Sequence, residues 1–205
     1  MALEAPALVF DFDGVLADTE PLIWKAWRDL LAPHHIPFTW DDYCRFGRGA
    51  TDEAMLRRLP LVSSDASLLA TLEEQIGARQ AVVGRWCLER SPIPAATVSM
   101  LHSLGHRSLG LVTSSERAEV EPILRDAGVL SCFRAIVCGD DCTRHKPDPE
   151  PYLLMRERLD ISGGLAFEDS EHGQASALAA GFTAIRVDDP WLLPEIVAAA
   201  EATAR

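Results

Sequence analysis

The feature that most constrains this chain is a series of short apolar segments that alternate with helical segments and end in polar residues. Residues 7–10 form an apolar run that stops at Asp11, and later runs of the same kind end near Thr113 and at Glu168. Short apolar runs are typical of buried strands. Their alternation with helices predicts a parallel sheet covered by helices on both faces. We therefore expect a Rossmann-like, three-layer α/β/α core.

A stretch without strand signals interrupts this alternation after the first strand. Its apolar residues recur at helical spacing, as in 22–31, and Thr39 is placed as a helix N-cap. We predict four helices here, the last a long one that begins near Asp65. The predicted organisation is an α/β core of residues 1–18 and 91–205, with an all-helical cap inserted over 19–90.

Composition excludes several classes of protein. Apolar residues make up 48% of the chain and charged residues 24%, which excludes a disordered chain. With 19 Lys and Arg against 31 Asp and Glu, the formal net charge is −12, so we expect no nucleic-acid partner. No segment approaches the roughly 20 apolar residues of a membrane span. The start has no basic region and the five cysteines form no CxxC pair, which favours a cytoplasmic protein without a membrane partner.

Polar residues follow the predicted strands at one edge of the sheet. In open α/β sheets, ligands bind outside the carboxyl ends of the strands. The residues at or near those ends are Asp11, Asp13, Thr113, Ser114, Lys146, Glu168 and Asp169. Clustered carboxylates repel one another unless a cation lies among them, and carboxylate oxygens suit Mg²⁺. A metal, an acidic nucleophile, a lysine and a hydroxyl group together indicate phosphoryl transfer.

Four motifs in this order carry a family resemblance. The stretch DFDGVLADTE contains Asp11 and Asp13, TSS covers 113–115, HKPDPEPY begins at His145, and FEDSEHG begins at Phe167. Together they resemble the motifs of the haloacid dehalogenase superfamily of phosphatases and mutases. The similarity is to the branch with a helical cap after the first motif, which includes beta-phosphoglucomutase and phosphoglycolate phosphatase.

The resemblance implies catalytic roles for four residues. Asp11 is expected to attack phosphorus and form an aspartyl-phosphate. Asp13 is expected to protonate the leaving oxygen and then to activate water. Thr113 would hold a phosphoryl oxygen through its hydroxyl group, and Lys146 would neutralise that oxygen and Asp11.

The resemblance also implies a Mg²⁺ cofactor and a phosphoryl-binding set. The expected metal ligands are Asp11, Asp13 through its backbone carbonyl, Asp169, and Glu168 in an assisting role. The expected substrate-binding residues are Thr113, Ser114 and Lys146. The predicted substrate is a small phosphorylated metabolite, in particular a sugar phosphate, and the predicted assembly is a monomer or weak homodimer.

Two positions depart from the sugar-phosphate mutases of this branch. Ile23 stands where those enzymes carry a cap histidine, ten residues after the second acid, and Asp52 stands, in a looser alignment, where they carry an arginine. Because isoleucine cannot transfer a proton, we favour a phosphatase, with a sugar phosphomutase as the alternative. A response-regulator receiver lacks the cap and the DxD spacing, and a dehalogenase does not need Asp13 or a metal.

Three further residues receive weaker predictions. We expect Arg48 on the surface, with contact to an anionic substrate as the alternative. His172 is expected to begin a helix after the acidic motif. Trp24 is expected at a packed interface, with a lid contact over the site as the alternative.

Overall fold

A computed structural model describes residues 6–203; positions 1–5 and 204–205 of the predicted core lie outside the described residues. Five parallel strands form one sheet in the order β3-β2-β1-β4-β5. The strands are β1 (Ala7–Phe10), β2 (Leu109–Val112), β3 (Ala135–Val137), β4 (Gly164–Glu168) and β5 (Thr183–Arg186).

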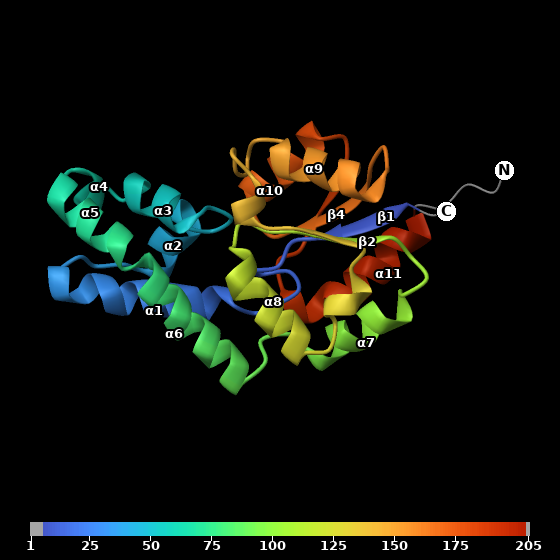
Figure 1. Cartoon of the computed structure of the whole chain (residues 1–205), viewed down its shortest axis with the longest axis horizontal. Coiled ribbons are helices and arrows are strands. Elements are labelled where there is room, and N and C mark those ends of the chain that lie inside the picture. The colour runs from blue at the N-terminus through green and yellow to red at the C-terminus, as the bar shows by residue number, and fades with distance from the viewer. Residues whose placement is uncertain (1–5, 204–205) are drawn as a thin grey trace.

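Helices cover both faces of this sheet (Figure 1). One face carries α9 (Glu150–Leu159) and α10 (Glu171–Ala179), and the other carries α7 (Ala95–Ser103), α8 (Arg117–Asp126) and α11 (Leu193–Thr203). The predicted three-layer α/β/α fold is therefore confirmed.

The sequence of β1 explains why it lies at the centre of the sheet. Successive side chains of a strand point to opposite faces. Leu8 and Phe10 enter the core cluster that contains Leu124 of α8, while Val9 enters the cluster that contains Tyr152 of α9. Since both faces are buried, all positions of β1 are apolar, and the strand reads as a continuous apolar run.

Six helices occupy the chain between β1 and α7 and lie to one side of the sheet (Figure 1). They are α1 (Glu20–Leu31), α2 (Trp40–Phe46), α3 (Asp52–Arg58), α4 (Pro60–Ser63), α5 (Ala66–Glu74) and α6 (Ile76–Glu89). These helices bury an apolar core of their own around Trp27, Leu56 and Leu72. The division into domains at 18/19 and 90/91 stays a prediction.

The number of cap helices differs from the prediction. The single long helix expected from Asp65 is divided at Gln75 into α5 and α6, and the short α4 precedes them. The break lets Leu72 and Ile76, on the two sides of Gln75, both enter the cap core. Periodicity of apolar residues does not reveal such a break because each half keeps its own helical stripe. The N-cap at Thr39 is confirmed, since its side chain accepts a hydrogen bond from the backbone N–H of Asp42.

The cap packs on the core through α6, which lies against α8. Within the cap, α6 also packs against α1. Ser114 also donates a hydrogen bond to the backbone carbonyl of Gly49 in the cap, at 3.3 Å. These contacts place the cap helices over the carboxyl edge of the sheet. Among the helices described, none has the length and apolar character that crossing a membrane requires.

Candidate active site

The ends of adjacent strands bring the predicted residues together at one edge of the sheet. Asp11 follows β1, Thr113 follows β2, and Glu168 is the last residue of β4. Because Phe10 is in register with both Leu111 and Phe167, the three strand ends lie side by side. Asp11, Thr113, Lys146, Glu168 and Asp169 are all buried.

Lys146 connects two of these carboxylates. Its side chain is 2% exposed, and Nζ lies 3.1 Å from Oδ1 of Asp11 and 2.7 Å from Oε1 of Glu168. Nζ also donates to the backbone carbonyl of Val112 at 3.0 Å. Burial lowers the pKa of Lys146, but the charges of Asp11 and Glu168 outweigh burial and raise it above its ordinary value. Lys146 is therefore a permanent cation beside Asp11.

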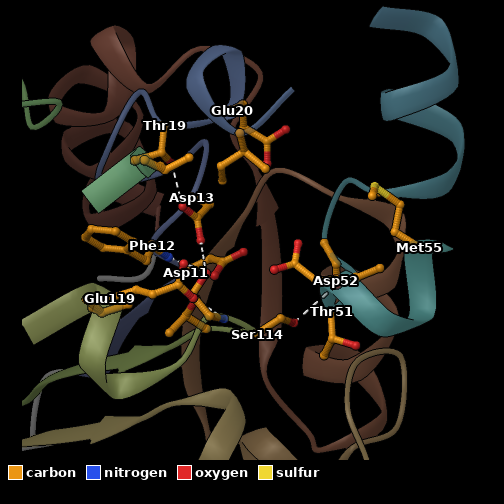
Figure 2. Close-up of a pocket in the computed structure, with 18 of the residues that line it drawn as sticks. Asp11, Phe12, Asp13, Thr19, Glu20, Thr51, Asp52, Met55, Ser114 and Glu119 are labelled. Atoms are coloured by element: carbon orange, nitrogen blue, oxygen red, sulfur yellow. Dashed lines mark hydrogen bonds between the residues drawn. The ribbon is translucent and has the colours of Figure 1, made fainter. Parts of the chain in front are cut away.

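Asp13 is held by two hydroxyl groups. Thr19 donates to Oδ1 at 2.5 Å and Ser115 donates to Oδ2 at 2.6 Å (Figure 2). Burial raises the pKa of Asp13, although both hydrogen bonds act in the opposite direction. The chain reverses at Gly14, which has φ +72°, so that Asp13 turns back over the strand end that carries Asp11. A carboxyl group with a raised pKa beside Asp11, the expected nucleophile, is suited to donate and accept protons.

Three carboxylates form a group that could hold a metal ion. Asp11, Glu168 and Asp169 each offer one oxygen, and these oxygens lie within 4.8 Å of one another. Oε2 of Glu168 and Oδ1 of Asp169 are buried and have no hydrogen-bond partner among the described residues. Buried carboxylate oxygens without partners fit a hard cation such as Mg²⁺. The side chain of Asp13 is outside this group, and the use of its backbone carbonyl as a ligand stays a prediction.

Two glycines leave room for these carboxylates. A Cβ atom at Gly14 would overlap Oδ2 of Asp169, and a Cβ atom at Gly173 in α10 would overlap Oε2 of Glu168. Glu168 is further fixed by the hydroxyl of Tyr152, which donates to Oε1 at 2.5 Å. The backbone therefore approaches the cluster more closely than a larger residue would allow.

Thr113 and Ser114, the first two of the three hydroxyl residues after β2, have different hydrogen-bond partners. Oγ1 of Thr113 accepts from the backbone N–H of Ser115 at 3.0 Å, which leaves its own hydrogen available to a substrate. The hydroxyl of Ser114 is instead bonded to Gly49 of the cap, although Ser114 lines the cavity. The predicted role of Thr113 is compatible with this geometry, and that of Ser114 stays a prediction.

Arg48 does not lie free on the surface, contrary to the preferred prediction. Its Nε lies 2.6 Å from Oδ2 of Asp169 and 3.6 Å from Oε2 of Glu20. Burial and then the charge of Asp11 raise the pKa of Asp169 to about 6, while Arg48 acts to lower it. No local pattern could reveal this contact, because 121 residues separate Arg48 from Asp169.

Trp24 and His172 are not among the described residues that line this cavity. Trp24 packs inside the cap, where Nε1 donates to the carbonyl of Phe38 at 3.2 Å and the ring meets Trp40 edge to face. The interface prediction for Trp24 is thus favoured over a lid contact. His172 lies in the first turn of α10, as expected.

The cavity over Asp11 and Asp13 is enclosed between core and cap and has a volume of about 60 Å³ (Figure 2). The cap contributes Ile23, Asp52 and Arg79 to its wall, and the core contributes Thr113 and Glu119.

Five residues of the site were not predicted from the sequence: Thr19, Ser115, Tyr152, Arg79 and Glu119. Thr19, Ser115 and Tyr152 lie within the family motifs, but the sequence indicated no role for them. Arg79 and Glu119 belong to no motif.

Comparison with known proteins places the chain in a family. Residues 8–187 match the haloacid dehalogenase-like hydrolase family. The chain is 30% identical to the fructose-1-phosphate phosphatase YqaB of Escherichia coli over 88% of this chain and 95% of that protein. It is 32% identical to a phosphorylated carbohydrates phosphatase of Thermotoga maritima over 87% of this chain and 83% of that protein.

A solved structure supports the fold. The beta-phosphoglucomutase of Clostridium difficile aligns with a TM-score of 0.78 at 19% identity, over 97% of each chain. Similarity at this level of identity concerns the fold alone. The prediction of a phosphatase of this superfamily is confirmed: the chain belongs to the haloacid dehalogenase-like hydrolase family.

Proposed function

We propose that the protein is a Mg²⁺-dependent phosphatase of a small sugar phosphate, acting through an aspartyl-phosphate at Asp11. The observation that carries the proposal is the placement of Asp11 at the floor of the cavity, between the cation Lys146 and the proton-transfer candidate Asp13. The two relatives named as phosphatases of fructose 1-phosphate and of phosphorylated carbohydrates support the substrate class. We further propose a cytoplasmic enzyme that is a monomer or weak homodimer.

In the first step Asp11 attacks phosphorus. Its Oδ1 accepts from the backbone N–H of Phe12 at 2.7 Å and faces Lys146, so we assign the attack to Oδ2. The P–O bond to the leaving group breaks as the Asp11–phosphorus bond forms. Thr113 donates its hydroxyl hydrogen to one phosphoryl oxygen, and Lys146 offsets the charge that develops on the phosphoryl group.

Asp13 supplies the proton for the leaving oxygen. Its raised pKa keeps a larger fraction protonated than in an ordinary aspartic acid. Thr19 and Ser115 hold its two oxygens and so fix the direction of transfer. In the second step the ionised Asp13 takes a proton from water, the water oxygen attacks phosphorus, and Asp11 is regenerated.

Asp11, Glu168 and Asp169 would hold the metal, with the backbone carbonyl of Asp13 as a further ligand. When bound, Mg²⁺ supplies positive charge that offsets the carboxylates and the incoming phosphate. Arg48 would offset part of the charge of Asp169 at Oδ2, while the unpartnered Oδ1 of Asp169 stays available to the ion.

The small size of the cavity favours a movement of the cap during the reaction. A volume of about 60 Å³ accommodates a few water molecules rather than a sugar phosphate. Opening at the contact between α6 and α8 would admit the substrate, and closure would exclude bulk water during the first step.

The test is release of inorganic phosphate from p-nitrophenyl phosphate and from a panel of sugar phosphates, with Mg²⁺ and with excess chelator. We expect release that depends on Mg²⁺ and is abolished in Asp11→Asn. Mass spectrometry of acid-quenched enzyme should find one phosphoryl group on the peptide that contains Asp11. Full activity in chelator, or phosphate on another residue, would contradict the proposal.

A further inference from the structure

Three charged side chains from cap and core meet on the wall of the cavity. Arg79 of α6 contacts Oδ2 of Asp52 in α3 through Nη2, and the same nitrogen lies 3.5 Å from Oε1 of Glu119 in α8. All three residues line the cavity that contains Asp11 and Asp13. Figure 2 shows Asp52, Glu119 and Asp11 among the residues that line this cavity.

The guanidinium group of Arg79 is fixed in place. Its side chain is 4% exposed, and Cζ lies 5.6 Å from the ring centre of Trp27. Nε1 of Trp27 donates to Oδ1 of Asp52 at 2.9 Å, so the carboxylate partner is also held. Arg79 is the only cation among the described residues that line the cavity. At pH 8, above the pKa of about 7 to which burial raises Glu119, its charge is matched by two carboxylates, so this part of the cavity has no surplus positive charge for a second anionic group.

One donor of Arg79 has no partner. Nε is buried and lacks an acceptor among the described residues. A buried N–H group of this kind requires an oxygen from a ligand or from water. A neutral hydroxyl group can accept from Nε and donate to a carboxylate of Asp52 or Glu119 at the same time. A carboxylate or phosphate has no hydrogen to donate and would be repelled by both carboxylates.

We propose that Asp52, Arg79 and Glu119 form the subsite that selects the leaving group, and that they select a neutral group with hydroxyls over a group with a second negative charge. The proposal rests on the proposed phosphatase function, since attack at Asp11 defines which part of the substrate is the leaving group. Phosphomonoesters of neutral polyols are therefore substrates, and phosphorylated carboxylic acids and bisphosphates are poor ones.

The test compares 2-hydroxyethyl phosphate with phosphoglycolate at pH 8, where Glu119 is ionised. The two compounds differ in a neutral CH₂OH group against a carboxylate. The ratio of their kcat/KM values measures the preference for a neutral over a charged leaving group. The rate of p-nitrophenyl phosphate hydrolysis measures separately whether the chemistry at Asp11 is intact. If either compound is not turned over, its inhibition constant against p-nitrophenyl phosphate replaces kcat/KM. We expect the wild type to favour the hydroxyl compound by on the order of 10-fold or more.

Two substitutions change the charge of the subsite with little change in shape. Glu119→Gln keeps an oxygen for the capping hydrogen bond from the backbone N–H of Glu116, and Asp52→Asn keeps an acceptor for Trp27. Together they leave Arg79 with an unmatched positive charge. We expect the ratio to fall by about 10-fold in Glu119→Gln and to invert in the double variant. Glu121→Gln, on the outer surface of α8 with partners Arg117 and Arg125, is the matched control and should leave the ratio unchanged.

Two outcomes would overturn this inference while leaving the phosphatase proposal intact. One is a wild-type preference for phosphoglycolate, and the other is a ratio that does not move in Glu119→Gln when thermal unfolding shows an intact protein. If p-nitrophenyl phosphate is not hydrolysed by the Mg²⁺-loaded wild type, the proposed function itself fails, and the subsite fails with it.

Discussion

Nε of Arg48 in the cap lies 2.6 Å from Oδ2 of Asp169 in the core, so a cap cation contacts the carboxylate cluster that is the candidate metal site. The guanidinium group therefore places a positive charge beside the candidate metal site, which opposes the binding of a cation there, and it connects cap to core. Since opposite charges attract most strongly when buried, this contact stabilises the closed cap when no metal is bound.

The first prediction concerns metal affinity. Arg48→Ala removes a positive charge from the cluster and frees Oδ2 of Asp169, so we expect Mg²⁺ to bind on the order of 10-fold more tightly in the absence of substrate. Isothermal titration of the purified variants measures this directly. Arg45→Ala, one turn earlier in α2, is the matched control, and unchanged or weaker binding in Arg48→Ala would show that Arg48 does not oppose Mg²⁺ binding.

The second prediction separates the two aspartates of the first motif. Asp11→Asn should abolish turnover because an amide is a poor nucleophile. Asp13→Asn should lower kcat by on the order of 10²–10⁴, because general acid–base catalysis is lost. Asp13→Asn should still form phospho-enzyme from p-nitrophenyl phosphate, whose leaving group needs no proton. Phospho-enzyme in Asp11→Asn would refute the assignment of the nucleophile.

The third prediction concerns the glycine under Glu168. Gly173→Ala places a methyl group against Oε2 of Glu168, so we expect weaker Mg²⁺ binding, by about 10-fold or more, and a loss of about 1–3 kcal/mol in the free energy of unfolding. Gly77→Ala in α6 is the control, since its Cβ would meet nothing within 4 Å. The control should gain up to about 1 kcal/mol from better helix propensity. Equal Mg²⁺ affinity in both variants would show that Gly173 has no part in shaping the metal site.

The fourth prediction concerns pH and stability. Burial raises the pKa of Glu119 from 4.5 to about 7, opposed by Arg79 and reinforced by Asp52 and Asp13. A raised pKa means that the folded state binds the proton more tightly, so this contribution to stability is complete below pH 4.5 and is lost as the pH rises through 7.

Glutamine does not titrate, so the free energy of unfolding of Glu119→Gln lacks this loss. Between pH 4.5 and pH 8 the variant should therefore become more stable than the wild type, by on the order of 2–3 kcal/mol. Urea unfolding at each pH measures the difference, with Glu121→Gln, at a half-buried position outside the cavity, as the control. A stability difference that does not change with pH would show that Glu119 titrates normally.

The fifth prediction separates hydrolase from mutase. Ile23 lines the cavity at the position where the resemblance places the cap histidine of the mutases, and none of the described residues that line the cavity is a histidine. We therefore expect no imidazole to couple cap closure to Asp13. We expect β-glucose 1-phosphate, if it is a substrate, to release phosphate without a bisphosphate activator. Following glucose 6-phosphate and free phosphate together tests this. Bisphosphate-dependent isomerisation with little phosphate release would favour the mutase.

The sequence by itself determined the α/β core and which polar residues lie together at the carboxyl edge of the sheet. Buried parallel strands consist of apolar runs, and the carboxyl ends of such strands lie at one edge of the sheet. Asp11, Thr113 and Glu168 each stand at the end of such a run, so the sequence predicts that they are neighbours. The number of cap helices was not predictable, because the break at Gln75 depends on how α5 and α6 pack.

Only the tertiary structure decided which cap residues face that edge. Arg48 meets Asp169 across 121 residues, and Arg79 meets Glu119 across 40. No local pattern encodes these pairs, because they depend on how the cap lies on the core through α6 and α8. Local periodicity specifies the face that each helix buries within its own unit, whereas charge pairing between units follows from their relative placement in space.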